Sequence, residues 1–499
     1  MKTTKFLAII LTFVLFSSAF VACGGTTGGG TVGDKVTMEG VYSLYSAKLG
    51  TEDVTDDFSM YLLTFEGDSL TVVINYLNLP ERRESSYTAT KTTVTETYKG
   101  QKYTYTIDGD TLKTRYKDLD TYIDVVLKKE TDSSLTDKTV DFESVLFGES
   151  INDVKKFNYC PAILTEVNDE GETVMHIWYC TNKDSGIIMD HIGYRTGVLQ
   201  ENGKWLFSDE QIVLAPTPGT WDSRHTCDPT VIKGEFKLNG ETYNYLMSYL
   251  GCTTEDYQKN ETGLAVAKNV GGPWVKVDNL NPIVPWYDDG VESEEQAKYE
   301  SYLGTNKIYW GTGMPSLISV DGKGDVLLFY QSTKRGTGVR RLDLSDLNNP
   351  QEIFVSSVNF NGAVNSQGVK CSPGIADFAY DKTAKRLYVT ATTNEKRPPD
   401  VTKTLVSSHS ALYYVDVEDM NAVCELMKNG GGYKWNTVGF VGPDETGWNR
   451  NHNPALVKTD GGYIPDSTKI GVVVSTGNND WANENIFTYR LFGHWFNIK

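Results

Sequence analysis

The stretch HTCDPTVIKGEF, residues 225–236, places an aspartate directly before a proline at the head of an apolar strand. The same shape, in which one residue is followed by proline, a small residue and aliphatic residues, recurs along the chain. Proline suits the first position of a strand, because its missing N–H removes no ladder bond there. The five heads are CPAIL (160–164), DPTVI (228–232), MPSLI (314–318), SPGIA (372–376) and NPALV (453–457).

Each head is followed by a longer, very hydrophobic run, such as YNYLMSYLGC (243–252) or IGVVVSTGN (470–478). A pair of this kind describes the two inner strands of a four-stranded blade, and five such units arranged radially make a propeller. An ordinary large β-sandwich is the alternative, but it would not be expected to repeat one strand head five times. We therefore predict an all-β chain with a five-bladed β-propeller over residues 140–499.

Residues 36–135 are rich in Thr, Tyr and Val and contain short alternating runs. YLLTFEGDSLTVVINYL (61–77) reads as a strand, a Gly-Asp turn and a second strand. We expect a small antiparallel β-barrel or sandwich here, similar to the lipocalin-like domains of surface lipoproteins. It carries no catalytic constellation, so a spacer or an accessory binding module is its expected role.

The N-terminus reads as a targeting segment. A basic start and an apolar stretch (residues 1–22) run into Cys23, and this arrangement resembles a bacterial lipobox. The alternative is an ordinary cleaved signal followed by a chance cysteine. We expect Cys23 to be acylated, residues 23–35 to form a flexible Gly/Thr linker, and the protein to be lipid-anchored outside the cytoplasmic membrane.

The charge balance excludes one class of partner. The chain has 65 acidic and 47 basic residues and a net charge of −18. Nucleic-acid binding needs clustered Lys and Arg, so no nucleic-acid partner is expected. Plain solubility is a sufficient reason for the acidity, and we expect a monomer.

The second repeat unit carries a more specific resemblance. It is similar to a blade of the five-bladed glycoside hydrolases of family 43 and of the related families 32 and 117. The matching elements are Asp228-Pro229, the YLMSY strand (245–249), the GLAVA strand (263–267) and the Gly272-Pro273-Trp274 turn. At the level of architecture, the likeness covers the repeat region. It implies an enzyme that hydrolyses glycosidic bonds of an oligo- or polysaccharide.

The chemistry of that family uses three carboxylates: a general base, a general acid and one that tunes the acid. Carried over by position, the head of the first unit has Cys160 instead of the base. The second unit offers Asp228 in the tuning position, and the third head, GTGMPSLI (311–318), has no carboxylate. Either other residues supply the general acid and the general base, or the propeller no longer hydrolyses glycosidic bonds.

Two further carboxylates are candidates for these roles. Asp377 lies on the first strand of the fourth unit, and Glu261 directly precedes the third strand of the second unit. The candidate catalytic set is thus Asp228, Asp377 and Glu261. For Asp377, a structural carboxylate that accepts backbone N–H bonds is at least as good a reading, and for Glu261 the structural reading is the better one.

Several residues near the strand heads are candidates for sugar binding. Sugar rings pack their C–H faces on aromatic rings, and polar side chains hold hydroxyls. A lone histidine is more often a hydrogen-bonded structural residue, and some of the tryptophans could stand near the heads by chance. The candidates are Trp221, Asp222, His225, Trp310, Trp448, His452 and Asn453, with Trp481 as a further aromatic residue.

Six cysteines follow Cys23, and an even number outside the cytoplasm permits disulfides. Cys160 and Cys180 flank the first hairpin, and Cys227 and Cys252 flank the second, so each pair could form a cross-strand bridge. Free buried thiols are the alternative. The spacing is not CxxC, so no metal site is assigned; we expect no cofactor, although a central structural ion such as calcium is compatible with a propeller.

Three functions stay open at this point. The first is a surface-anchored family 43-like glycoside hydrolase, and the second is a glycan-binding propeller without the acid and base. The third is a propeller with a structural role only. Asp228 favours the first two, and the missing carboxylates of the first and third heads favour the second.

Overall fold

A computed structural model describes most of the chain. Residues 1–35 lie outside the described part, so the predicted signal segment, the anchor at Cys23 and the Gly/Thr linker stay predictions; so does Trp481. No helix among the described residues is long and apolar enough to cross a membrane. The described residues are 36–38, 40–55, 58–76, 79–118, 121–129, 139–147, 155–168, 171–184, 186–253, 259–287, 310–333, 335–393, 408–430, 433–477 and 483–498.

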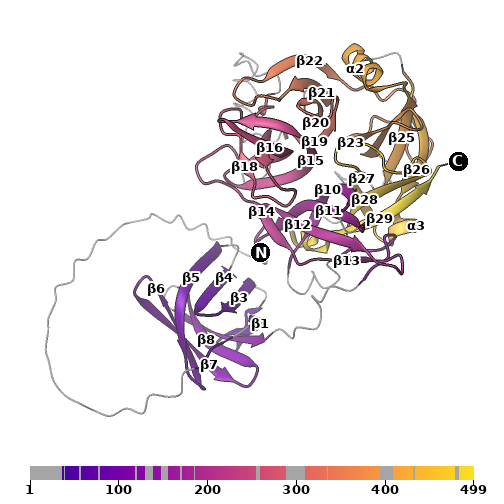
Figure 1. Cartoon of the computed structure of the whole chain (residues 1–499). Coiled ribbons are helices and arrows are strands. Elements are labelled where there is room, and N and C mark those ends of the chain that lie inside the picture. Colours follow the sequence, from indigo (N-terminus) through magenta and orange to yellow (C-terminus); the bar gives the residue numbers. More distant parts are fainter. Residues whose placement is uncertain are drawn as a thin grey trace, which may run out of the picture.

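The N-terminal strands form one antiparallel sheet that follows chain order except for β2, which pairs only with β1 (Figure 1). The sheet closes into a barrel because β1 pairs with β3 on one side and with β9 on the other. Inside it, the buried Arg83 guanidinium holds Glu96, which also accepts a hydrogen bond from Tyr105. The strands are β1 (Gly40–Leu49), β2 (Glu52–Asp53), β3 (Phe58–Glu66), β4 (Ser69–Tyr76), β5 (Leu79–Ala89), β6 (Thr93–Tyr98), β7 (Gln101–Asp108), β8 (Thr111–Asp118) and β9 (Thr121–Lys129).

The remaining strands form five blades around one axis, as the repeated heads predict (Figure 1). Blade 1 contains β10 (Asn158–Val167), β11 (Thr173–Asn182), β12 (Asp190–Leu199), β13 (Trp205–Phe207) and β14 (Gln211–Leu214). Blade 2 contains β15 (His225–Leu238), β16 (Glu241–Cys252), β17 (Asn260–Ala267) and β18 (Val275–Lys276). Blade 3 contains β19 (Thr312–Ser319), β20 (Asp325–Ser332), β21 (Gly336–Asp343) and β22 (Gln351–Ser357).

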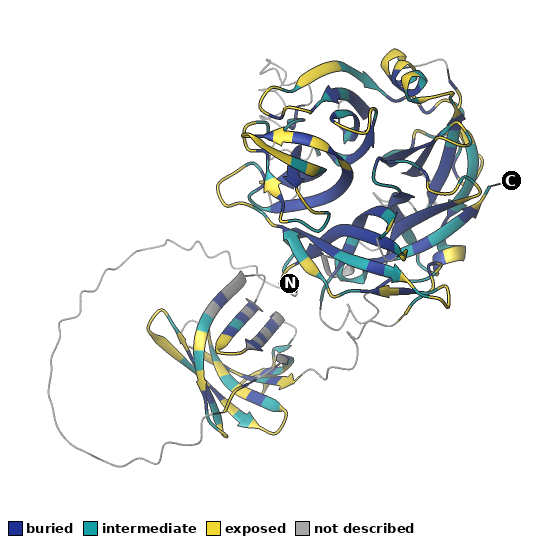
Figure 2. Ribbon diagram, in the orientation of Figure 1, coloured by how far each residue is buried: buried dark blue, intermediate teal, exposed yellow. Residues whose placement is uncertain are grey.

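Blade 4 contains β23 (Gly374–Asp381), β24 (Arg386–Thr392), β25 (Ser410–Asp416) and β26 (Asn436–Val441), with α2 (Met420–Asn429) between the last two. Blade 5 contains β27 (Arg450–Lys458), β28 (Lys469–Gly477) and β29 (Arg490–Asn497), accompanied by α3 (Pro443–Thr446) and the 3₁₀ helix η2 (Asn483–Thr488). The strands nearest the axis are the most buried (Figure 2).

The hydrophobic cores lie between neighbouring blades. Phe329 of blade 3 stacks on Phe378 of blade 4 with ring centroids 3.9 Å apart. Similar clusters join blades 1 and 2, 2 and 3, and 4 and 5. Because each blade buries one face on each neighbour, the hydrophobic free energy belongs to the ring and not to single blades.

Backbone pairing helps to close the ring between blades 5 and 1. β10 pairs in parallel with β27, through Ile163–Val457 and Leu164–Lys458, so these two blades share one sheet. In addition, residues 139–147 link the outer edges of the two blades through isolated bridges. Val140 exchanges backbone hydrogen bonds with Trp205 of blade 1. Further along, Leu146 N–H donates to the Leu491 carbonyl of blade 5, and Gly493 N–H donates to the Ser144 carbonyl.

Each strand head contains a β-bulge with one residue in the left-handed region. These residues have φ between 46° and 56° and stand at a register shift between the first two strands. Such a conformation costs about 1–3 kcal/mol for a residue other than glycine. The bulged residues are Cys160, Asp228, Met314, Ile375 and Asn453.

The bulges correct two expectations about the heads. Proline does not begin the strand: β15 starts at His225, and Pro229 follows the bulged Asp228, where no ladder bond is needed. In blade 4 the bulged residue is Ile375, so the repeat is three residues later than SPGIA suggests and Pro373 precedes the strand.

The N–H groups of the bulged residues are bound by the preceding blade. Cys160 N–H donates to Ser475 Oγ (2.8 Å), Asp228 N–H to Cys180 Sγ (2.9 Å), Ile375 N–H to Gln331 Oε1 (3.1 Å) and Asn453 N–H to Thr392 Oγ1 (3.2 Å). In each case the acceptor lies on the second strand, opposite the residue just before the bulge. We call these contacts, together with the Met314 contact described below, the axial ring of hydrogen bonds.

We predict that Ser475→Ala lowers the free energy of unfolding by about 1–3 kcal/mol, because it leaves the buried Cys160 N–H without its acceptor. Urea denaturation measures this change. Ser475→Thr is the matched control, because threonine already serves as the acceptor in blade 4. An equal loss in both variants would show that the hydroxyl does not matter.

Candidate functional site at the propeller axis

The five heads meet around a small pocket on the axis. Its volume is about 30 Å³, which is enough for about two water molecules. The fold and this site therefore define a five-bladed β-propeller with an axial pocket. The pocket is lined by Cys160, Pro161, Ala162, Asp228, Pro229, Thr230, Met314, Pro315, Ile375, Ala376, Asp377, Asn453 and Pro454.

Asp228 is the candidate residue with the most unusual environment. Its side chain is buried beside the Cys180–Cys227 disulfide, with Oδ1 3.3 Å from Cys227 Sγ. Burial and, to a smaller extent, the nearby Asp190 carboxylate raise the pKa of Asp228 to about 7, although hydrogen bonds from Cys160 and from Met314 N–H oppose the rise. The Asp228 carboxyl group can therefore hold or release a proton near neutral pH.

The axial ring explains why an aspartate stands at this head. At the position that supplies the acceptor in the other four blades, blade 2 has Leu250, which lies opposite Cys227 and cannot accept a hydrogen bond. Met314 N–H instead donates to Asp228 Oδ2 at 3.2 Å. Asp228 thus supplies the acceptor of the axial ring in blade 2 from the bulged position itself. It therefore has a structural role in addition to any role in binding or catalysis.

Asp377 lines the same pocket but is fully engaged. It accepts hydrogen bonds from Ser316 Oγ (2.6 Å), Leu456 N–H (2.8 Å) and Lys458 Nζ (2.7 Å). The Lys458 side chain is 2% exposed, so this is a buried ion pair whose separation would be costly. Asp377 therefore joins blades 3, 4 and 5, which matches the structural alternative given for it from the sequence.

Glu261 lies at the start of β17 and is not among the residues that line the pocket. Its Oε1 accepts the Trp286 N–H at 3.1 Å. Burial raises the pKa of Glu261, while the Trp286 hydrogen bond lowers it. The structure thus brings Asp228 and Asp377 to one pocket and places Glu261 elsewhere on blade 2.

Trp221 and Asp222, just before the second head, make contacts within blade 2. The Trp221 ring covers Gly251 and Gly263, where a Cβ atom would come within 2.2 and 2.3 Å of it. Asp222 is completely buried and binds Lys276 Nζ and the Tyr249 hydroxyl. Neither side chain lines the axial pocket.

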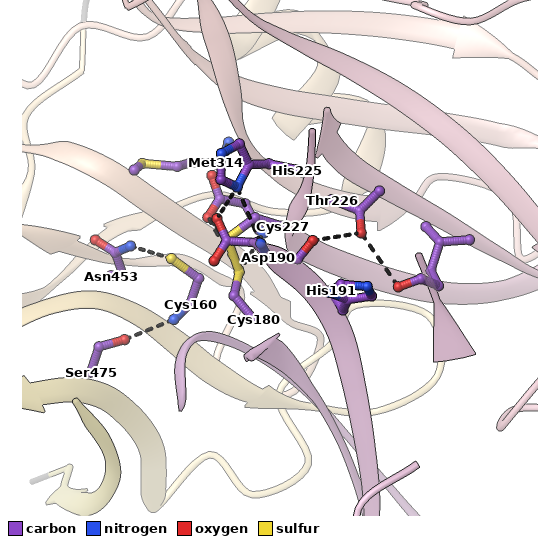
Figure 3. The surroundings of a disulfide bond; sticks show 12 residues. Cys160, Cys180, Asp190, His191, His225, Thr226, Cys227, Met314, Asn453 and Ser475 are labelled. Carbon is purple, nitrogen blue, oxygen red and sulfur yellow. Dashed lines mark hydrogen bonds and ion pairs between the residues drawn. A yellow bond between two sulfur atoms is a disulfide. The ribbon is translucent and has the colours of Figure 1, made fainter. Parts of the chain in front are cut away.

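His225 pairs with a residue that sequence reasoning missed. Its Nδ1 accepts the Asp190 N–H at 3.1 Å and lies 3.1 Å from Asp190 Oδ2, and both side chains are completely buried (Figure 3). Asp190 opens β12 of blade 1, so the pair links two blades. The available signal was a charged residue, MDHIGY (189–194), at the start of an otherwise apolar strand.

In the fifth head, Asn453 reaches the pocket and His452 does not. Asn453 Nδ2 donates to Cys160 Sγ (Figure 3). Burial and the nearby Arg450 hold the pKa of His452 well below its usual range, so the ring is neutral. A second missed residue is Lys458, which ends the apolar run NPALVK (453–458) and whose buried charge was the available signal.

Two of the predicted aromatic residues are half-buried near the heads. Trp310 packs beside the apolar cluster that contains Leu250 and Cys252. The Arg490 guanidinium lies over the Trp448 ring, 5.0 Å from the ring centroid, in a cation–π contact. Both rings come from loops that precede a strand head, as the sequence suggested, but neither lines the axial pocket.

The cysteine pairing differs from both hairpin bridges considered from the sequence. The disulfide joins Cys180 of blade 1 to Cys227 of blade 2, and Cys160, Cys252, Cys371 and Cys424 do not take part in it. The reason is the register: Cys227 lies opposite Leu250 and Cys252 lies opposite His225, so the two are not partners. Cys180 faces blade 2, where it also accepts the Asp228 N–H.

No family model matches this chain, and no curated protein matches it. Among solved structures, it is similar to a family 117 glycoside hydrolase from Zobellia galactanivorans (13% identity, TM-score 0.41, 73% of this chain and 90% of that chain). It is also similar to an endo-arabinase from Bacteroides thetaiotaomicron (13% identity, TM-score 0.35, 72% and 97%). The five-bladed architecture itself stands on the strand pairing described above.

We predict that the stability of the protein falls as pH rises from about 4 to 7 through Asp228. In an unfolded chain this carboxyl group titrates near 3.8, whereas in the folded protein its pKa is about 7. Between these two pKa values the folded protein holds a proton on Asp228 that the unfolded chain has already lost, so the free energy of unfolding falls as the pH rises. Above pH 7 the folded protein loses this proton as well, and the fall ends. At about 1.4 kcal/mol per pKa unit, the loss is about 4 kcal/mol.

Urea denaturation of the wild type and of Asp228→Asn between pH 4 and 8 measures this effect. The asparagine variant keeps an acceptor for Met314 N–H but does not titrate, so its stability should depend less on pH. Parallel pH curves for the two proteins would contradict the assignment.

Proposed function

We propose that the protein is a glycan-binding β-propeller without the acid–base pair of the hydrolases that its second blade resembles. The observation that carries this proposal is the state of the carboxylates around the pocket. Of the two that line it, Asp377 is neutralised by Lys458, and only Asp228 stands outside an ion pair. The bulged residues of blades 1 and 3 are Cys160 and Met314.

Glycoside hydrolysis with inversion needs a general acid and a general base about 6.5–9.5 Å apart, with room for a water molecule between them. Among the residues that line the axial pocket, Asp228 has no second free carboxylate as a partner. One carboxyl group with a pKa of about 7 can orient a hydroxyl but cannot fill both roles.

Binding requires less of the site. The Asp228 carboxyl group and the Asn453 amide face the same pocket and can exchange hydrogen bonds with a hydroxyl group. The pocket volume of about 30 Å³ admits a group of that size, so a sugar ring would lie across the mouth of the pocket. Half-buried aromatic rings near the heads, Trp310 and Trp448, supply faces on which such a ring can pack.

The proposal is tested with arabino-, xylo- and galacto-oligosaccharides, by isothermal titration calorimetry and by assays for sugar release. We expect binding without release, and we expect Asp228→Asn to weaken binding about 10-fold, because it exchanges a charge-assisted hydrogen bond for a neutral one. The matched control is Asp444→Asn, an exposed carboxylate on α3.

Two outcomes would contradict the proposal in different ways. If aryl-glycosides release sugar and Asp228→Asn abolishes that release, the protein is a hydrolase. If neither binding nor release occurs with any of these glycans, the protein has no carbohydrate function of this kind.

The lipid anchor predicted at Cys23 would hold the propeller on the outer side of the cytoplasmic membrane, where glycans are available to it. This placement rests on the sequence alone. In cells, Cys23→Ala should move the protein from the membrane fraction to the soluble fraction. Retention of the variant in the membrane fraction would refute acylation at this residue.

A further inference from the structure

A second cluster of chemistry-bearing side chains lies directly beside the axial pocket. One ligand atom from each of Cys160, Cys180, Cys227 and Asp228 can be chosen so that all four lie within 4.8 Å of one another. The four residues come from β10, β11 and β15, so two blades contribute to the cluster. Figure 3 shows the three cysteines side by side. All four side chains are buried.

Three sulfurs and one carboxylate oxygen match the ligand preference of one class of metal ion. Zn²⁺ prefers thiolate and binds four ligands tetrahedrally with Zn–S bonds of about 2.3 Å, which separates the ligand atoms by about 3.8 Å. The spacing of the cluster is compatible with this geometry once Cys180 and Cys227 are no longer bonded to each other. Oxygen-seeking ions such as Ca²⁺ do not favour such a set.

Two of the cysteine sulfurs already accept hydrogen bonds of the kind that ligand sulfurs accept in metal sites. Asn453 Nδ2 donates to Cys160 Sγ, and the Asp228 N–H donates to Cys180 Sγ. Donors of this kind orient thiolate ligands and stabilise their negative charge. Cys160 and Asp228 also line the axial pocket, which gives an ion a path to the cluster.

We propose that Cys160, Cys180, Cys227 and Asp228 form a site for one Zn²⁺ ion when the Cys180–Cys227 disulfide is reduced. In the reduction, a dithiol gives its two hydrogen atoms to the two sulfurs and becomes a disulfide itself. The three thiols then release three protons as three Zn–S bonds form. The Asp228 carboxylate supplies the fourth bond.

The electrostatics of the cluster favour a cation in the reduced state. Without a metal, burial raises the pKa of the Cys160 thiol well above its usual range, and the Asp228 carboxylate adds to this rise. A divalent ion removes that penalty, because a coordinated thiol is deprotonated outright. The completely buried Asp190 carboxylate adds further negative charge next to the cluster.

Disulfide and metal are alternative states of the same sulfurs. In the oxidised state, Cys180 and Cys227 are bonded to each other, and Cys160 and Asp228 alone are too few ligands for a tetrahedral site. Both states connect blade 1 to blade 2 at the axis. The two proposals share Asp228, but the zinc site does not depend on glycan binding, since its test measures metal content without any glycan.

The experiment uses the folded protein, reduced with a dithiol under nitrogen, freed of reductant and given Zn²⁺. Metal content is measured by mass spectrometry after removal of unbound ion, and Co²⁺ is used in parallel for its thiolate charge-transfer absorption. We expect one equivalent of Zn²⁺ in the reduced protein and none in the oxidised protein. Zinc should also raise the Tm of the reduced protein.

Cys160→Ser should lower the zinc affinity of the reduced protein at least about 10-fold, because it removes a ligand and leaves the disulfide pair in place. Cys371→Ser, which removes a half-buried thiol outside the cluster, is the matched control and should leave the affinity unchanged. The proposal is overturned if the reduced wild type binds no zinc, if Cys160→Ser binds as tightly, or if the oxidised protein binds an equal amount.

Discussion

The axial ring of hydrogen bonds is the constraint on which the rest of the propeller depends. Each blade must turn its first strand toward the axis, and a bulge with a left-handed residue makes that turn. The bulge frees a backbone N–H group in a buried place, and the preceding blade supplies its acceptor. The strain of five heads is therefore offset only in a complete ring, which makes the blades mutually dependent.

This constraint also decides how the carboxylates at the axis can be used. Asp228 stands in the ring because Leu250 leaves the Met314 N–H without another acceptor. Asp377 stands where Thr230 and Ser316 stand in blades 2 and 3, and like them it accepts an N–H group from the next blade. Proximity to the axis thus has a structural cause for both aspartates, and only Asp228 keeps an unpaired carboxyl group for a ligand.

Much of the fold was readable from the sequence because the two inner strands repeat one pattern in four of the five blades. The pattern fails in blade 4, where Ser372 and Pro373 imitate a head three residues before the true bulge at Ile375. Local sequence cannot distinguish the two, because the difference lies in the register against β24. The bridges from residues 139–147 to blades 1 and 5 were equally hidden, since they join distant parts of the chain.

The site was harder to predict because its side chains meet through contacts between blades that are distant in the chain. Neighbours within a hairpin suggested cysteine pairs within one blade, whereas the disulfide and the zinc-type cluster are made across two blades. Asp190 and Lys458 were missed because their importance comes from partners on the adjacent blade. Strand heads could be found from residue types, but which side chains face one another at the axis depends on how neighbouring blades are rotated.

The segment at residues 139–147 has a mechanical consequence. It is the first described segment of the propeller along the chain, and its bridges join it to β13 of blade 1 and to β29, the last strand. A pull transmitted from the N-terminal side reaches this outer edge before it reaches any axial hydrogen bond. These edge bridges can therefore yield under load while the centre of the ring, where blades 1 and 2 are cross-linked, keeps its shape.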